Sequence, residues 1–235
     1  MKQNQLVQET IYKHQPNELI FANQVYSQQL VGKVSEAAYY KTLERMCKAG
    51  TLAKAAKGTY YIPKQSAFGV VPPSEREIVS SFTKNHSGTV IGYTLYNQLG
   101  LTTQIAKTVE VLSSAMETQV KTIRNVVVHS SSLSFSKKNA EMIHALEVMK
   151  NISEIQDINY SALVSFFQKV AAQFDQAVFD EVISIQHYSK RTIAFFQEIL
   201  NYYQKPNSLQ KYLSSLSTYQ FPKMEELYEA ARLPQ

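Results

Sequence analysis

The stretch Ser35-Glu-Ala-Ala-Tyr-Tyr-Lys-Thr-Leu-Glu-Arg-Met-Cys-Lys-Ala-Gly50 decides the fold of the front of this 235-residue chain. Ser35 is a typical N-cap residue and Gly50 a typical helix stop, so the two residues bound one helix. Apolar side chains recur at helical spacing on one face, and they are Tyr39, Leu43, Met46 and Cys47. The opposite face then holds Glu36, Ala37, Tyr40, Lys41, Glu44, Arg45 and Lys48. We expect this face to point outward.

The segments on either side of this helix complete the order helix, strand, helix, helix, hairpin. Before it, the pattern predicts a helix over 3–14, a short strand over 19–21 and a helix over 23–29, with Gly32 in the following turn. After it, strands over 51–54 and 59–62 enclose a tip at 55–58. Residues 1–64 are therefore predicted to form a winged helix-turn-helix domain.

The positive charge of the chain is concentrated in the same segment. The chain has 24 Lys and Arg against 19 Asp and Glu, a formal net charge of +5. Residues 1–64 contain nine basic and four acidic residues, whereas residues 65–235 contain fifteen of each. This asymmetry favours a polyanionic partner for the basic part. The alternative is a small domain whose lysines only keep it in solution.

Double-stranded DNA is the polyanion that this pattern fits best, because an α-helix enters the major groove while lysines and arginines neutralise phosphates. We predict that Arg45 makes a bidentate contact to guanine or phosphate and that Ser35 and Tyr40 hydrogen-bond a base or a phosphate. Further phosphate contacts are expected from Lys41, Lys54 and Lys57, and the predicted DNA-binding set is completed by Lys33 and Lys48.

Two acidic residues on the same helix face, Glu36 and Glu44, count against a purely electrostatic interpretation. A second hypothesis is therefore a protein-interaction module in which the winged helix is structural. A third is a ligand-sensing transcription regulator whose helical part holds a small molecule.

The middle of the chain is predicted to be a linker followed by a small α+β domain. Residues 65–73 contain Gly69 and end in a proline pair, so we interpret them as the linker. The domain over 74–135 is expected to contain a helix capped by Ser74, a helix ended by Gly100, strands at 108–112 and 120–128, and a third strand around Leu133 and Phe135. The strand over 120–128 is long enough to be central in a sheet.

Residues 136–235 are predicted to be helical and to pack on the middle domain, which makes the protein α+β and mostly α overall. All seven glycines lie in the first hundred residues, and apolar residues recur at helical spacing after Ser136. Asp175 is expected to cap one of these helices and Pro222 to occupy the first position of the last one. The many aromatic residues are expected to bury their own core, with a homodimer interface as the alternative.

No pattern of residues indicates catalysis, a metal or a cofactor. The five histidines are scattered without metal-ligand spacing, and no phosphate-binding glycine loop or hydrolase motif occurs. Asp175 and Asp180 are interpreted as a cap and a solvated residue, and Cys47, the single cysteine, as a small buried hydrophobe. We expect a cytoplasmic, non-enzymatic protein, with neither an export signal nor a membrane span.

Two segments resemble the AbiEi-type antitoxins, the transcriptional-repressor half of type IV toxin–antitoxin pairs that act in abortive infection against phage. Residues 48–63 are similar to the wing pattern G-x-L … G-x-Y-Y of that family. Residues 91–104 end in Leu99-Gly-Leu-Thr-Thr-Gln104 and resemble the helix and L-G-L-T-x-Q motif that open its second domain.

The resemblance implies a repressor that binds repeats in its own promoter through residues 1–64. It also implies that residues 65–235 counteract a nucleotidyltransferase-like toxin, with or without touching it. From the residues themselves, Gly100 and Thr102 are interpreted as a helix end and a strand start rather than as binding residues.

Overall fold

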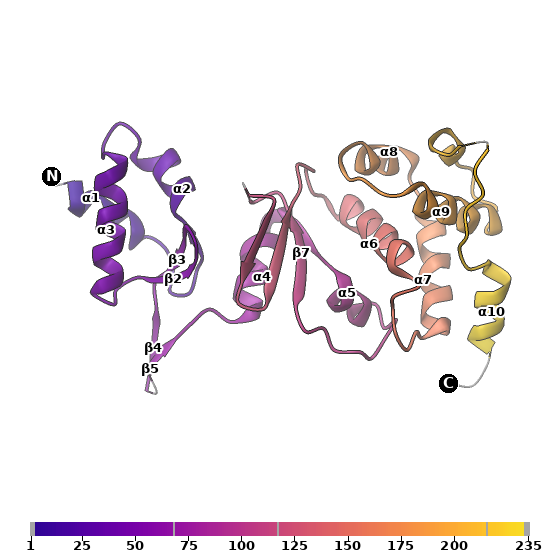
Figure 1. Ribbon diagram of the computed structural model, residues 1–235, viewed down its shortest axis with the longest axis horizontal. Helices are drawn as coiled ribbons and strands as arrows, with labels where there is room; N and C mark the ends of the chain where they lie inside the picture. Colours follow the sequence, from indigo (N-terminus) through magenta and orange to yellow (C-terminus); the bar gives the residue numbers. More distant parts are fainter. Residues whose placement is uncertain (1–2, 68, 117, 215, 233–235) are drawn as a thin grey trace. The chain divides into compact units, whose positions relative to one another are not determined.

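The computed structural model of the protein describes residues 3–67, 69–116, 118–214 and 216–232. It is an α+β structure in which the chain divides into two compact units (Figure 1). The N-terminal unit comprises Met1–Ser81 with Thr122–Val126, and the C-terminal unit comprises Phe82–Lys121 with Val127–Gln235. Within the described ranges, no helix combines the length and apolarity needed to cross a membrane.

The N-terminal unit begins with three helical segments and a small antiparallel sheet. In chain order these elements are α1 (Gln3–Ile11), β1 (Ile20–Phe21), α2 (Ala22–Val25) with a π-helical turn (Tyr26–Leu30), α3 (Glu36–Lys48), β2 (Ala53–Ala56) and β3 (Thr59–Tyr61). The strand order is β1-β3-β2. Ser35 caps α3 as expected, because its Oγ accepts a hydrogen bond from the backbone N–H of Ala38.

The core of this part of the unit is centred on α3. Tyr39 and Leu43 are fully buried, Met46 is almost so, and Cys47 is half-buried. The hydroxyl of Tyr39 donates to the carbonyl of Ala22 over 3.0 Å, which ties α3 to α2. The inward face predicted from the apolar spacing is thus the buried one.

The expected linker contains a hairpin instead. β4 (Lys64–Ser66) and β5 (Gly69–Val71) pair antiparallel, and all six of their residues are exposed. Gly69 takes a φ of +107°, a backbone conformation that glycine adopts readily, and its carbonyl accepts from the Ser66 hydroxyl. The same glycine that argued against a helix therefore permits a tight turn between two short strands. Phe68 lies outside the described residues.

The next helix, α4 (Glu75–Thr83), begins where the sequence predicts. Ser74 and Glu77 form a reciprocal capping box. The Ser74 hydroxyl oxygen accepts from the Glu77 N–H at 3.3 Å, and a Glu77 carboxylate oxygen accepts from the Ser74 N–H at 2.7 Å. A short 3-10 segment (Lys84–His86) follows.

A four-stranded sheet has the order β6-β7-β9-β8. Its strands and the helix between the first two are β6 (Gly88–Ile91), α5 (Gly92–Gln98), β7 (Val109–Ser113), β8 (Val120–Ile123) and β9 (Val126–Ser130). After α5, Gly100 has a φ of +69° and ends the helix as expected, and Thr102 donates its hydroxyl to the carbonyl of Gln156 over 2.7 Å.

The prediction of one long strand over 120–128 is wrong, because the chain turns at Arg124 and Asn125. Arg124 adopts a φ of +56°, and its guanidinium donates to the carbonyl of Pro73 over 2.9 Å. The predicted third strand around Leu133 and Phe135 is also wrong: both side chains are buried, but the segment is irregular. The two apolar residues, two positions apart, are spaced as in a strand because both side chains are buried, although the backbone there is not a strand.

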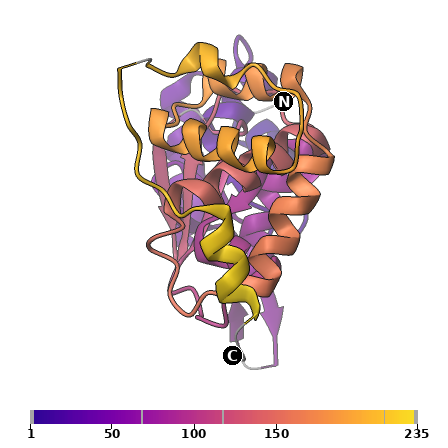
Figure 2. The same cartoon turned by 90° about the vertical axis from the view of Figure 1, so that its right-hand side faces the viewer.

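The remaining helices form most of the C-terminal unit. They are α6 (Lys137–Asn151), α7 (Tyr160–Ala172), α8 (Gln176–Ile185), α9 (Lys190–Tyr202), a 3-10 turn (Leu209–Tyr212) and α10 (Met224–Arg232). The first four are capped by side-chain oxygens of Ser136, Asn159, Asp175 and Ser189. Pro222 lies two residues before α10 and not at its first position. α10 lies beside α7 (Figures 1 and 2).

Aromatic rings fill the centre of this helical core. Phe196 on α9 is fully buried, and its ring lies edge-on to that of Phe174 at 5.5 Å and packs at 5.6 Å against that of Phe179. These rings join α9 to α8 and to the segment that precedes α8. Such a helical core is what the apolar spacing of residues 136–235 predicts.

Replacing Phe196 by Ala should lower the free energy of unfolding of the C-terminal unit by about 3–5 kcal/mol, because the truncation leaves a cavity. Chemical unfolding followed by circular dichroism measures this change. The matched control is Ile105→Ala, at a side chain that is 89% exposed, which should alter stability by less than about 0.5 kcal/mol. Equal effects of the two variants would contradict the central place given to Phe196.

Candidate nucleic-acid interface

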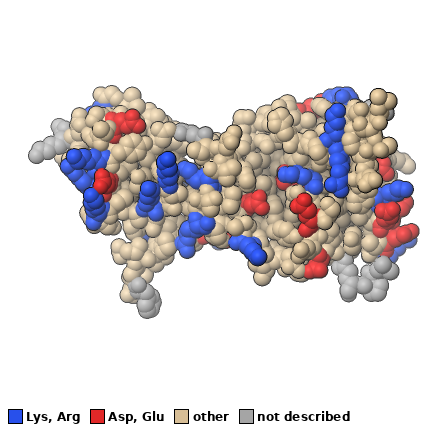
Figure 3. All heavy atoms as spheres, in the orientation of Figure 1, with Lys and Arg blue, Asp and Glu red and all other residues tan. Residues whose placement is uncertain are grey.

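The eight predicted DNA-binding residues all lie in the N-terminal unit, on α3 and the segments next to it. Tyr40, Lys41, Arg45 and Lys48 are on α3, Lys33 and Ser35 precede it, and Lys54 and Lys57 belong to the β2–β3 hairpin. Every one of them is exposed except Tyr40, which is half-buried. Figure 3 shows Lys and Arg side chains gathered over this part of the unit, with few carboxylates among them.

Four of the basic side chains are free to meet a partner. In the described part of the chain, no hydrogen bond or ion pair engages the side chains of Lys41, Arg45, Lys54 or Lys57. A cation without an internal partner can bind a phosphate without breaking a contact of the folded protein. These four residues are therefore the strongest candidates of the predicted set.

Three other predicted residues already have a partner inside the protein. The Lys48 amine lies 2.7 Å from a carboxylate oxygen of Glu44, and the Lys33 amine donates to the carbonyl of Gln29 over 3.2 Å. The Ser35 oxygen accepts the capping hydrogen bond from Ala38, so only its hydroxyl proton is left to donate. Lys33 and Lys48 therefore have to leave or share their partners in order to bind DNA, whereas Ser35 can donate its hydroxyl proton while it caps α3.

Tyr40 does not point fully outward, which corrects the expectation for that position. Its ring packs edge-on against that of Tyr39 at 5.1 Å. It also lies close enough to Tyr60 of β3 for each phenol to affect the other's electrostatics. Tyr40 therefore connects the helix to the hairpin, and only part of its side chain remains for an external contact.

Glu44 keeps a negative charge in the middle of the basic face. The hydrogen bond from Lys48 and the charge of Lys48 lower the pKa of Glu44, and the charges of Lys41 and Arg45 act in the same direction. Because its pKa is lowered, the carboxylate is ionised at neutral pH. It offsets part of the positive potential around Lys41 and Arg45, and Glu36 adds a second exposed carboxylate on this helix.

The end of α3 and the start of the hairpin are joined directly by backbone hydrogen bonds. The carbonyl of Met46 accepts hydrogen bonds from the N–H groups of Thr51 and Leu52 at 3.1 and 3.3 Å. Leu52 is buried in the same core as Leu43 and Met46. The chain thus passes from the end of α3 into β2 without a flexible connection.

Within the described residues, no group of three or more His, Cys, Asp or Glu could hold a metal ion. Asp180 is not the solvated residue that was expected. Its carboxylate accepts from Gln176, Lys211 and Tyr212 at 2.7, 2.7 and 2.8 Å, and so holds the 3-10 turn to α8.

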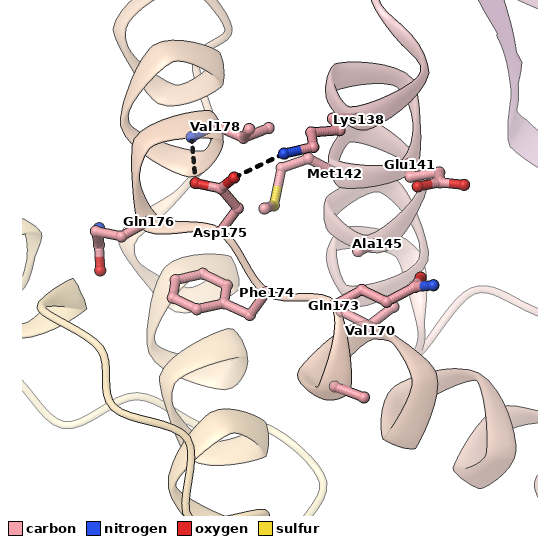
Figure 4. A pocket seen from close by; sticks show the side chains of 11 residues that line it. Lys138, Glu141, Met142, Ala145, Val170, Gln173, Phe174, Asp175, Gln176 and Val178 are labelled. Carbon is pink, nitrogen blue, oxygen red and sulfur yellow. Dashed lines mark hydrogen bonds and ion pairs between the residues drawn. The ribbon is translucent and has the colours of Figure 1, made fainter.

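The C-terminal unit contains cavities large enough for small molecules. One of about 640 Å³ lies between α6, the end of α7 and the start of α8 (Figure 4). Two of its three charged lining residues contact one another: the Lys138 amine lies 3.2 Å from a carboxylate oxygen of Asp175, which also caps α8 as expected, and Glu141 is the third.

Comparison with protein families gives one match. The model of DUF6088, a family of unknown function, matches residues 7–171, well over half of the chain. No curated protein matches the sequence significantly.

The half-buried Cys47 provides a test of how tightly α3 is packed beside the candidate interface. Burial raises the pKa of its thiol, the nearby Lys54 lowers it and Glu44 raises it, with a net rise. A raised pKa leaves less thiolate at neutral pH, so alkylation by iodoacetamide should be several-fold slower in the folded protein and should accelerate at a higher pH than for a free cysteine. The guanidinium-unfolded protein is the control. An identical pH profile for both forms would contradict the packing described.

Proposed function

The chain belongs to DUF6088, a family of unknown function, so we infer its function from the residues and geometry of the chain itself. We propose that it is a DNA-binding transcriptional repressor of the antitoxin type. In this proposal residues 1–64 act as a winged helix-turn-helix domain that binds double-stranded DNA. Residues 65–235 counteract a nucleotidyltransferase-like toxin.

The observation that carries the DNA-binding proposal is the set of unpartnered cations on α3 and the hairpin. Lys41, Arg45, Lys54 and Lys57 are exposed, and none is held by an ion pair or hydrogen bond among the described residues. The element order and the β1-β3-β2 sheet support this proposal, because in a winged helix the third helix enters the major groove and the hairpin lies against the backbone.

In this arrangement the residues have different tasks. Arg45 presents a planar guanidinium, which suits the O6 and N7 atoms of a guanine or two oxygens of a phosphate. Lys41, Lys54 and Lys57 contact phosphates and set the register of the domain on the duplex. Lys48 joins them when it exchanges its contact with Glu44 for a phosphate.

The antitoxin part of the proposal is supported by the resemblance of residues 48–63 and 91–104 to AbiEi-type antitoxins. A repressor of this type binds repeats in its own promoter and works in the cytoplasm beside the DNA. The near-neutral charge of residues 65–235 leaves them free for a task other than DNA binding.

A mobility-shift titration on the DNA upstream of its own gene, repeated over a salt series, tests the DNA-binding proposal. Each phosphate contact releases counterions, so four to six contacts predict a slope of about −4 to −5 in a plot of log affinity against log salt. Absence of binding at low salt would contradict the proposal and favour a protein-interaction module.

Charge reversal identifies the residues that make these contacts. Lys41→Glu with Arg45→Glu, and separately Lys54→Glu with Lys57→Glu, should each weaken binding at least tenfold and make the salt slope shallower by about 2. Glu44→Gln should strengthen binding, because it removes a charge from the same face. Lys190→Glu, an exposed lysine of the C-terminal unit, is the matched control and should leave the slope unchanged.

The two proposed activities should be separable. When the neighbouring toxin gene is co-expressed, the variant with all four reversals should lose promoter binding and still protect cells, since neutralisation is assigned to residues 65–235. Cell growth and a promoter reporter measure the two effects. Loss of protection by this variant, with its circular dichroism unchanged, would contradict the division of roles.

A further inference from the structure

A second cavity, of about 660 Å³, lies entirely within the C-terminal unit. Its walls come from α5, β7, β9, α6 and the segment 186–188 that follows α8. Known small-molecule sites span roughly 300–1,000 Å³, so this cavity has the size of a ligand site. None of the residues that line it belongs to the proposed DNA-binding surface.

The charges that line this cavity are mainly negative. They comprise the carboxylates of Glu110, Glu147 and Glu154 against the single ammonium group of Lys150. With the two lining histidines, His129 and His187, in their neutral form, the formal charge is −2. A cavity with this balance attracts cations and repels phosphates and carboxylates.

Glu147 is the most deeply placed of the three carboxylates. Its side chain is only 9% exposed, whereas that of Lys150 is 50% exposed. The Lys150 amine lies 3.4 Å from both carboxylate oxygens, and the amide nitrogen of Asn151 lies 3.4 Å from one of them. These contacts are long for charge-assisted hydrogen bonds, and the lysine can turn into water while the carboxylate cannot. Among the residues that line the cavity, Lys150 is the one cationic group in contact with this carboxylate.

Tyrosines also line the cavity, and two of them, Tyr96 and Tyr188, lie close enough to Glu147 to feel its charge. Tyr96 is held by the Asn151 amide, which donates to its hydroxyl over 2.8 Å. The ring of Tyr93 lies edge-on to that of Tyr96 at 5.6 Å. Burial raises the pKa of Tyr96 and of Tyr188, and the charge of Glu147 adds to the rise in both cases. The rings therefore stay neutral, and neutral aromatic faces attract organic cations.

Gly92 and Glu110 lie next to one another on the cavity wall. A Cβ atom at position 92 would lie 2.9 Å from a carboxylate oxygen of Glu110, so a larger residue there would make this side chain shift. Gly92 also adopts a φ of +66°, which favours glycine. The other Glu110 oxygen lies 3.6 Å from Nε2 of His129. Glu110 and His129 thus lie side by side on the cavity wall, and Glu110 adds a second carboxylate to the lining.

We infer that this cavity binds an organic cation that bears ammonium or guanidinium groups, with Glu147 as the buried counter-ion, Glu110 and Glu154 as further acceptors, and the tyrosine rings as walls. The same chemistry is offered by a free amine and by a lysine or arginine side chain of a partner polypeptide. The cavity between α6, α7 and α8 is a poorer candidate, because Lys138 and Asp175 are paired with each other and Glu141 is the one further carboxylate in its lining.

Calorimetric titration of the full chain with agmatine, spermidine, an arginine-containing peptide and, as the anionic probe, AMP tests this inference. At least one cationic probe should bind with a dissociation constant below about 1 mM, and AMP should not bind. Binding of a free amine identifies a small-molecule site, whereas binding of the peptide alone identifies a partner's side chain. No cationic probe binding below about 1 mM, or stronger binding of AMP, would overturn the inference.

Substitutions locate the bound cation. Glu147→Gln and, separately, Glu154→Gln should each raise the dissociation constant, the first at least tenfold and the second several-fold. Glu141→Gln, an exposed position on the same helix α6 that does not line this cavity, should change it less than twofold. Because Glu154 is exposed, its replacement leaves the fold intact even if replacement of the buried Glu147 does not. Equal affinities of the Glu154 and Glu141 variants, or a Glu147 variant that folds and binds as the unmodified chain does, would contradict the assignment.

Discussion

The buried hydroxyl of Tyr39 sets the direction in which α3 faces, and the candidate interface depends on that direction. The side chain is fully buried and donates to the carbonyl of Ala22, while its ring packs between those of Tyr26 and Tyr40. Burial raises the pKa of this phenol, so it keeps its proton and its hydrogen bond at any physiological pH. With Tyr39 held inward, helical geometry turns Lys41 and Arg45 outward.

The parts of the structure that local chemistry determines could be predicted from the sequence. The bounds of α3 follow from Ser35 and Gly50, and the start of α4 follows from Ser74 and Glu77, because caps act within one helical turn. The exposure of the basic residues on α3 follows from the same periodicity. The hairpins β4–β5 and β8–β9 could not be predicted from such local signals. The turn at Arg124 depends on the carbonyl of Pro73, far away in the sequence.

The cation cavity also could not be located from local patterns, although one signal was present. Glu147 has apolar neighbours on both sides in the run Ala145–Met149. A charged residue is seldom found at such a position unless it has a partner. The whole run Ala145–Met149 of α6 is buried, so Glu147 lies apart from the exposed residues of this helix. Only the packing of α5, β7 and the segment after α8 shows that the carboxylate meets tyrosines.

The short segment Thr122–Val126 belongs to the N-terminal unit although the chain on both sides of it belongs to the other unit. Ile123 and Val126 within it are fully buried. A fragment cut after residue 81 would lack these two side chains and the Arg124 contact to Pro73, and would expose the surface that they cover. The N-terminal unit is thus discontinuous in sequence, so its complete fold is available only after the ribosome has synthesised more than half of the protein.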